Sequence, residues 1–186
     1  MAELAVLISY RYKLPMAIEY LDHNALRKPL HFKVKDQSVR QVIASIVGSV
    51  PGYQVDFSQG LVDIYSPAAR SDTSNPLNMV VRKYDAEGLD THIADTQLLC
   101  AIGRQINPNS GCGGSVAAGQ WGNLKITLHL ENKRVYEVLN AIVAQNGRAI
   151  WAPLAHPVGP SRMMTNFWYI YPLDPPFQGS VLDRLQ

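Results

Sequence analysis

Few residues of the chain have the type and spacing that chemistry requires. Asp56 and Asp63 flank one predicted hairpin, and a pair of carboxylates can carry out acid–base catalysis where a protein buries it. Because both residues lie next to a turn, we expect solvated side chains. The five histidines have no metal-ligand spacing such as His-x-x-x-His, and we expect them to face solvent: His23, His31, His92, His129 and His156. The sequence therefore predicts no catalytic residue, no metal site and no cofactor.

The two cysteines are Cys100 and Cys112, and Cys112 lies in the flexible sequence GCGGS. No histidine near it in sequence offers the base that a nucleophilic thiol needs. The glycines around it lack the Gly-Lys-Ser/Thr ending of a phosphate loop. In an exported protein a Cys100–Cys112 disulfide could close this loop and stabilise the fold by about 3 kcal/mol. The alternative is a buried thiol at Cys100 and an unrelated loop thiol at Cys112.

Aromatic side chains crowd the last predicted hairpin. Alternation along its second strand places Phe167, Tyr169 and Tyr171 on one face and Trp168 on the other. One face must cover a helix, and the other could be an exposed aromatic patch that contacts a partner. Core packing is the alternative. The candidate interaction surface consists of Trp151, Phe167, Trp168, Tyr169 and Tyr171.

The elements that must position these side chains follow from hydrophobic periodicity. Ser38 or Asp36 can cap the second predicted helix and Asp95 the third, while Gly52 and Gly147 follow the second and the fourth. Apolar residues at helical spacing predict helices at 2–13, 39–47, 95–106 and 135–146. Alternating runs predict strands at 16–21, 30–34, 53–57, 61–65, 79–84, 125–130, 148–154 and 166–173.

One strand–helix unit occurs twice, in PLHFKVKDQSVRQVIASIVGSVPG and in KITLHLENKRVYEVLNAIVAQNG. A shift of 96 residues superposes eight apolar positions, from Leu30 on Ile126 to Val47 on Val143. Nearly all positions between them are polar or small in both copies, with Tyr136 as the main exception. Agreement in period, turn position and following hairpin indicates a duplicated structure. Two ordinary amphipathic units that agree by chance are the alternative.

The repeat predicts an α+β protein of two tandem small modules. Each module would pack two helices on or between short β-sheets, as a βαβ-type repeat that ends in a β-hairpin. The first module spans 1–66 and could lack its leading strand. A linker rich in Ser, Pro, Asn and Ala follows at 67–78. The second module spans 79–173 with an insertion at 107–122, and a tail covers 174–186.

This pattern resembles the short N-terminal domain shared by secretins and TonB-dependent transducers. The residues that carry the resemblance are KLPMAIEYL, LHFKVKDQSVRQVIASIVGSVPGYQVDFSQGLVDIYS and ITLHLENKRVYEVLNAIVAQNGRAIW. It covers most of 1–66 and 79–172, and it rests on apolar patterns. The resemblance implies periplasmic α+β domains of Gram-negative bacteria that bind other proteins and are not enzymes. The chain departs from the family in having two copies without a β-barrel or secretin region, and in the insertion.

Composition excludes several other classes. At 47% hydrophobic and 17% charged residues the chain should fold, and its net charge of +2 with no basic stripe excludes a nucleic-acid surface. No stretch approaches the ~20 apolar residues of a transmembrane helix. The N-terminal AELAVLISYRY carries Glu3 and lacks a cleavage site, so it is not a signal peptide. We expect a longer natural precursor that supplies the export signal.

These observations predict a non-enzymatic module of the periplasm or cell envelope that acts through contacts with a protein partner. The alternative is a small-molecule or glycan-binding module that uses the aromatic hairpin and the glycine-rich loop. An enzyme whose residues assemble only in space is the third possibility. A deep pocket with several ionisable groups of shifted pKa would support it.

Overall fold

Five strands from distant parts of the chain form one mixed sheet. The computed structural model describes residues 2–19, 36–109, 111, 124–153 and 168–173. Within them the strand order is β2 (Gln54–Asp56), β3 (Val62–Tyr65), β1 (Met16–Ile18), β6 (Ala149–Pro153) and β7 (Trp168–Pro172). Strand β1 pairs in parallel with β3 on one side and with β6 on the other, and two antiparallel pairs complete the sheet.

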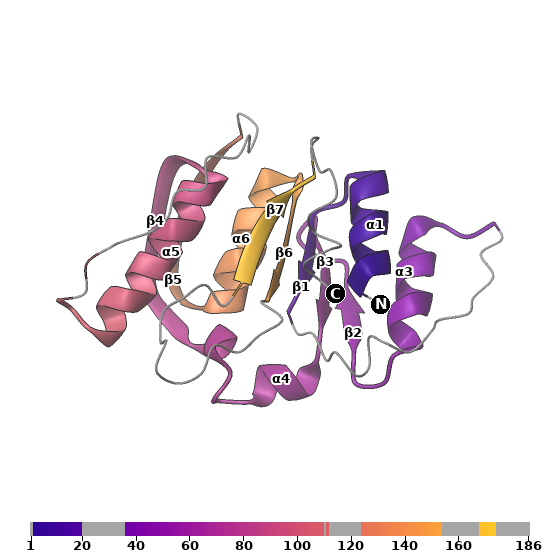
Figure 1. Cartoon of the computed structure of the whole chain (residues 1–186), viewed down its shortest axis with the longest axis horizontal. Helices are drawn as coiled ribbons and strands as arrows, with labels where there is room; N and C mark the ends of the chain where they lie inside the picture. The colour runs from indigo at the N-terminus through magenta and orange to yellow at the C-terminus, as the bar shows by residue number, and fades with distance from the viewer. Residues whose placement is uncertain (1, 20–35, 110, 112–123, 154–167, 174–186) are drawn as a thin grey trace.

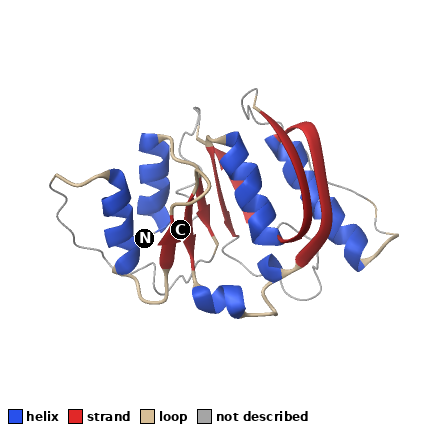
Figure 2. Cartoon of the chain, turned by 180° about the vertical axis from the view of Figure 1, so that it is seen from behind, coloured by secondary structure: helices blue, strands red, loops and turns tan. Residues whose placement is uncertain are grey.

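Helices cover both faces of this sheet, and a second sheet completes a four-layer arrangement (Figure 1). On one face lie α1 (Ala2–Tyr12) and α3 (Val39–Gly48). On the other lie α5 (Thr91–Ile106) and α6 (Val135–Asn146). Beyond α5 and α6, the long strands β4 (Val80–Asp90) and β5 (Lys125–Arg134) form a curved antiparallel ribbon (Figure 2).

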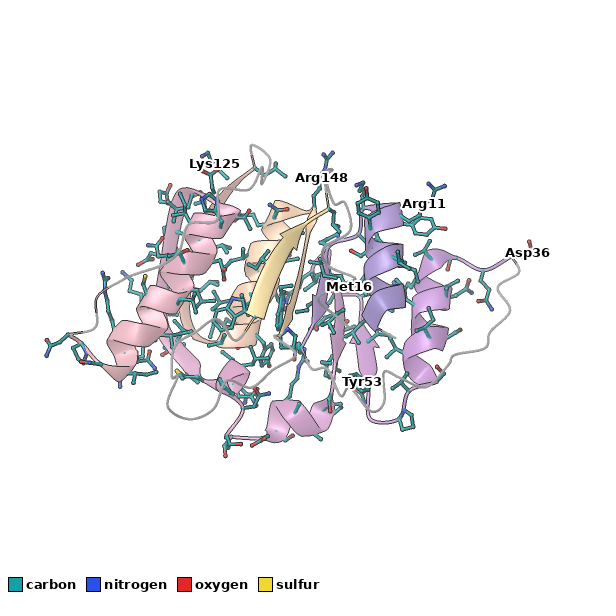
Figure 3. The ribbon with its side chains drawn as sticks, in the orientation of Figure 1. Arg11, Met16, Asp36, Tyr53, Lys125 and Arg148 are labelled. Carbon is teal, nitrogen blue, oxygen red and sulfur yellow. The ribbon has the colours of Figure 1, made fainter. Side chains whose placement is uncertain are left out.

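Alternation along the strands divides the buried side chains into two cores. Met16 and Ile18 belong to the core with α1 and α3, whereas Ala17 belongs to the core with α5 and α6. Met16 of the central strand β1, labelled in Figure 3, is fully buried. On the α6 side, Ile126 of β5 and Leu139 of the helix are both fully buried in one cluster. This is the packing that the repeated strand–helix unit predicts.

The ends of the helices agree with the predicted signals in part. Ser38 and Gln41 form a reciprocal capping box at the start of α3, and Gly147 ends α6 with a left-handed φ of 68°. The first repeat helix ends at Gly48 and not at Gly52. The predicted cap Asp95 is wrong, because α5 begins one turn earlier with Asp90 at its N-cap.

The stretch predicted as a linker is folded against the body. It contains the helix α4 (Pro67–Ser71) and a short 3-10 helix (Pro76–Asn78), each begun by a capping side chain and a proline. Leu77 is buried, and the amide of Asn78 donates to the Ala69 carbonyl over 2.8 Å. Caps and prolines occur in linkers and at helix starts alike, so composition alone does not separate the two.

The α+β class is confirmed, and the division into two tandem modules is not. Strand β1 comes from the first predicted module, but it lies between β3 and β6 of the same sheet. Several predicted features lie outside the described residues: the strand at 30–34, most of the insertion 107–122, the tail, His23, His31, His156, Cys112 and Phe167. None of the helices in the described ranges is long and apolar enough to cross a membrane.

Candidate functional site

A cluster of buried polar side chains lies on the α6 face of the sheet. Glu19, directly after β1, is 4% exposed, and Asp63 of β3 is 8% exposed. The two residues are brought together because β1 and β3 are neighbours, with Ala17 opposite Asp63. Two carboxylates buried side by side are unfavourable unless other groups neutralise or hydrogen-bond them.

Arg70 of α4 supplies the positive charge of the cluster. Its Nε donates to Glu19 Oε2 over 2.8 Å, and its Nη2 donates to Glu19 and to Asp63 Oδ2, the latter over 2.6 Å. Its guanidinium carbon also lies 3.5 Å from the ring centroid of Tyr65 and 4.6 Å from that of Tyr136. The arginine is therefore held in place by two carboxylates and two aromatic faces.

Helix α6 joins the cluster through Asn140. Its amide nitrogen donates to Asp63 Oδ2 over 2.9 Å, while its amide oxygen accepts a 2.7 Å hydrogen bond from the indole of Trp151. The orientation of this amide is thus fixed from both sides. The chain of hydrogen bonds links β3, α6 and β6 through side chains that are all buried.

The cluster is one positive charge short. Glu19 and Asp63 can carry two negative charges, and Arg70 carries one positive charge. No described residue donates a hydrogen bond to Asp63 Oδ1, which is buried. Burial, and then the neighbouring charge of Glu19, raise the pKa of Asp63 to about 7, against the opposing effect of Arg70. Burial alone would lower the pKa of Arg70, but its hydrogen bonds to Glu19 and the negative charges of Glu19 and Asp63 together outweigh that effect and raise it.

A pocket of about 380 Å³ opens beside this cluster. Helix α6 packs on β1 and β6, and the neighbouring strands β2 and β3 carry the polar side chains of Asp56 and Asp63 at the pocket. Asp63 and Arg70 line the pocket together with Leu61 and Leu130. Its remaining walls come from β2 and the β2–β3 turn, the end of β5 and the first turns of α6, and include Asp56, Ser58, Gln59, Lys133, Tyr136 and Glu137.

Asp56 lies at the open side of the pocket. It is exposed, and it is the residue directly opposite Asp63 in the β2–β3 pair. The hydroxyl of Ser58 donates to its Oδ2 over 2.7 Å and lowers the pKa of Asp56. Of the two aspartates that flank the hairpin, Asp56 is solvated as expected, and Asp63 is buried instead.

Of the predicted aromatic surface, the two residues with described side chains, Trp151 and Trp168, do not line this pocket. Trp151 and Trp168 are 0% and 2% exposed, so the core-packing alternative holds for both. The Trp168 indole donates to Asp95 Oδ1 over 2.6 Å, and burial raises the pKa of that carboxyl to about 6. Tyr169 and Tyr171 lie in β7, but the structure does not describe their side chains.

The remaining predicted residues stay apart from the pocket or outside the described ranges. The possible Cys100–Cys112 disulfide involves a residue that is not described, so it stays a prediction. His129 is exposed on β5 near Asp85 and Glu87, and the hydrogen bond to Asp85 raises its pKa. Among the residues with described positions, no three histidine, cysteine or acidic side chains converge as a metal site would require.

Sequence reasoning missed Glu19, Arg70 and Asn140. Of these, Asn140 gave a usable signal, because it interrupts the apolar run VLNAIV, and the 96-residue shift matches it with Ala44 of the other copy. A polar residue that replaces alanine beside the buried stripe of a helix marks a polar contact. Glu19 and Arg70 lie in segments whose composition is ordinary for a strand end and a turn.

No protein-family model matches the chain, and neither a curated protein nor a solved structure matches it.

Proposed function

We propose that the chain is a non-enzymatic module of the periplasm or cell envelope that binds an extended segment of a partner protein beside β2 and the pocket. The proposed cellular compartment follows from the resemblance of the sequence to the N-terminal domains of secretins and transducers. The binding mode is the addition of a strand to a sheet edge, in which backbone hydrogen bonds give affinity and alternate side chains give specificity.

The observation that carries this proposal is the position of β2. Among the described strands it is the last of the five-stranded sheet on its side, so its outer edge has no described neighbour. Gln54 and Asp56 are exposed, and Asp56 borders the pocket. A strand that pairs with β2 would place every second side chain on the face that carries Asp56 and Asp63.

A catalytic role has one argument in its favour and a stronger one against it. The pKa values of Asp56 and Asp63 shift in opposite directions, as those of an acid–base pair do. A general acid must reach the reacting atom, however. Asp63 Oδ2 accepts hydrogen bonds from Arg70 and Asn140, and Oδ1 is buried. This geometry favours a binding site over an active site.

Site-specific photocrosslinking in the native host tests the proposal. A photoreactive residue at exposed Gln54 should capture an envelope protein, while the same group at exposed Gln97 of α5 provides the matched control. Crosslinks to one defined protein from Gln54 alone are the expected result. Equal capture at both positions, or none at either, would count against a partner at β2.

The second candidate is a small-molecule or glycan-binding module, and the pocket is the observation that favours it. Its volume falls in the range of ligand pockets, roughly 300–1,000 Å³. In this case the ligand would contact the half-buried Tyr136 and not the buried tryptophans of the last hairpin. A soluble ligand should raise the melting temperature of the wild-type protein, and Tyr136→Ala should abolish that increase. A screen that finds no stabilising ligand would leave the protein partner as the better proposal.

A further inference from the structure

We propose that the pocket binds an organic cation between the side chains of Asp56 and Asp63. The cation can be a lysine or arginine side chain of the partner or a free amine. The side-chain source rests on the proposed function, and the free amine does not.

The first argument is the cross-strand pair itself. Asp56 and Asp63 lie directly opposite each other on antiparallel strands, so their side chains project from the same face of the sheet. Side chains in this position have Cβ atoms about 4.5–5.5 Å apart, and like charges there repel. A positive charge between the two carboxylates would turn this repulsion into two attractions.

The second argument is that the pocket's own cations are already engaged. Arg70 is shared between Glu19 and Asp63, and Lys133 Nζ lies 3.5 Å from Glu137 Oε1. No salt bridge joins Asp56 to a residue within the described ranges, although the charge of Arg70 contributes to lowering its pKa. An anionic ligand such as phosphate would meet uncompensated carboxylates, so the balance of charge favours a cation.

The third argument is the unsatisfied acceptor behind Asp56. Asp63 lines the pocket, its side chain is 11% exposed, and one of its carboxylate oxygens, Oδ1, has no donor among the described residues. A buried acceptor without a donor is costly. A proton on Asp63 removes that cost, which agrees with its raised pKa. A cation that Asp56 holds in the pocket would instead stabilise the ionised carboxylate of Asp63 through its charge, without a hydrogen bond to the buried Oδ1.

The proton and the cation are therefore linked. The charged and titratable groups that face Asp63 are Glu19, Arg70 and Asp56, with Tyr136, Lys133 and Glu137 on the other wall of the pocket. Binding of a cation should release a proton from Asp63 where this group is protonated, and affinity should rise as the pH rises through the pKa of Asp63. Leu61, Leu130 and Tyr136 offer apolar surface for the stem of a lysine or arginine side chain.

Calorimetric titration of the full chain with Nα-acetyl-lysine amide and Nα-acetyl-arginine amide tests the site. We expect millimolar binding that strengthens from about pH 6 to about pH 8, with release of protons. Asp56→Asn should weaken binding roughly tenfold by removing a charge-assisted contact. Asp72→Asn is the matched control, since Asp72 is also exposed and also accepts from a serine two residues later, but does not line the pocket.

Further measurements separate the possible outcomes. Asp63→Asn should bind no more tightly than the wild type does at low pH, and its affinity should not depend on pH. The indole proton of Trp151, two hydrogen bonds from Asp63, should shift in NMR spectra on binding. Absence of binding by both amides, or equal weakening by Asp56→Asn and Asp72→Asn, would overturn the site. Binding without release of protons would overturn the linkage.

The source of the cation is decided separately. Peptides that carry one lysine in an extended sequence should bind more tightly than the free amide if the partner supplies the side chain, and acetylation of that lysine should abolish the difference. If the amides bind but no partner crosslinks at Gln54, the cation site stands and the proposed function falls. If a partner crosslinks and Asp56→Asn leaves its binding unchanged, the function stands and this inference falls.

Discussion

The helices α3 and α6 have the same pattern of apolar residues but different surroundings. Both begin at equivalent residues of the repeat, Val39 and Val135. Helix α3 lies at the outside of the molecule, whereas α6 lies between the two sheets (Figure 1). Three residues of α3 are buried and seven of α6, and two of those seven are asparagines. The same apolar stripe can therefore build a peripheral helix or a central one.

The residues of α6 that line the pocket differ from their counterparts in α3. Tyr136, Glu137 and Asn140 of α6 take the places of Arg40, Gln41 and Ala44 in α3. The apolar positions that agree form the two cores. Comparison of the two copies thus separates residues that maintain the fold from residues that could recognise a ligand.

The largest expected difference concerns the cores. Leu139→Ala and Ile43→Ala truncate equivalent buried residues, and each should lower the free energy of unfolding by about 2–5 kcal/mol. We expect the greater loss for Leu139, because it packs in the cluster between two sheets. Urea denaturation of both variants measures the difference. Equal losses, or a greater loss for Ile43→Ala, would mean that the central position of α6 does not make it contribute more to stability than α3.

The next effect is a dependence of stability on pH that only the α6 side should show. The folded pKa of Asp63 is raised to about 7 from 3.8, so between these values the folded state holds a proton that the unfolded state has released. The free energy of unfolding should therefore fall by roughly 1–3 kcal/mol as the pH rises through this window. The raised pKa of Asp95 should lower the free energy of unfolding in the same way as the pH rises to about 6.

Urea denaturation at several pH values, repeated with Asp63→Asn and Asp95→Asn, assigns this dependence. Each variant should reduce the pH dependence of the free energy of unfolding: Asp63→Asn up to about pH 7, and Asp95→Asn up to about pH 6. The control Asp72→Asn should leave this dependence unchanged. A wild-type stability that rises from about pH 4 to about pH 7 would contradict the assignment of a held proton to Asp63.

Asn140→Ala gives α6 the alanine that α3 has at the equivalent position, Ala44. It leaves the indole of Trp151 without its acceptor and Asp63 without one donor, and should cost about 1–3 kcal/mol. Adding Trp151→Leu removes the unsatisfied indole, so the double variant should lose less than the sum of the two single losses. Additive losses in urea denaturation would show that the amide does not couple the two residues.

The smallest effect concerns the helix starts. Ser38→Ala removes the hydroxyl that caps α3 and should cost about 1 kcal/mol. The equivalent residue of α6 is Arg134, which makes no side-chain cap, so Arg134→Ser should stabilise the protein by about 0.5 kcal/mol. Thermal denaturation measures both changes. Destabilisation by Arg134→Ser would instead indicate that the contact of Arg134 with the Arg70 carbonyl matters more than a cap.

Local patterns predicted the elements well, because periodicity and capping depend on neighbouring residues. The helix 39–48, the β2–β3 hairpin and the glycine at the end of α6 were all readable from the sequence. The place of β1 in the sheet was not, since a strand of three residues carries no information about partners far along the chain. The site shows the same limit. Arg70 and Glu19 are 51 residues apart, and Asn140 and Asp63 are 77 residues apart.

The place of β1 also has a consequence for how the chain reaches its fold. Met16 pairs with Ile150, so the centre of the larger sheet joins segments roughly 130 residues apart in sequence. Contacts of such long range form late and slow the folding of a domain. During synthesis, β1 leaves the ribosome well before β6, and it gains its second neighbour only when β6 has followed. Until then, the edge of β1 that later pairs with β6 is open to other strands.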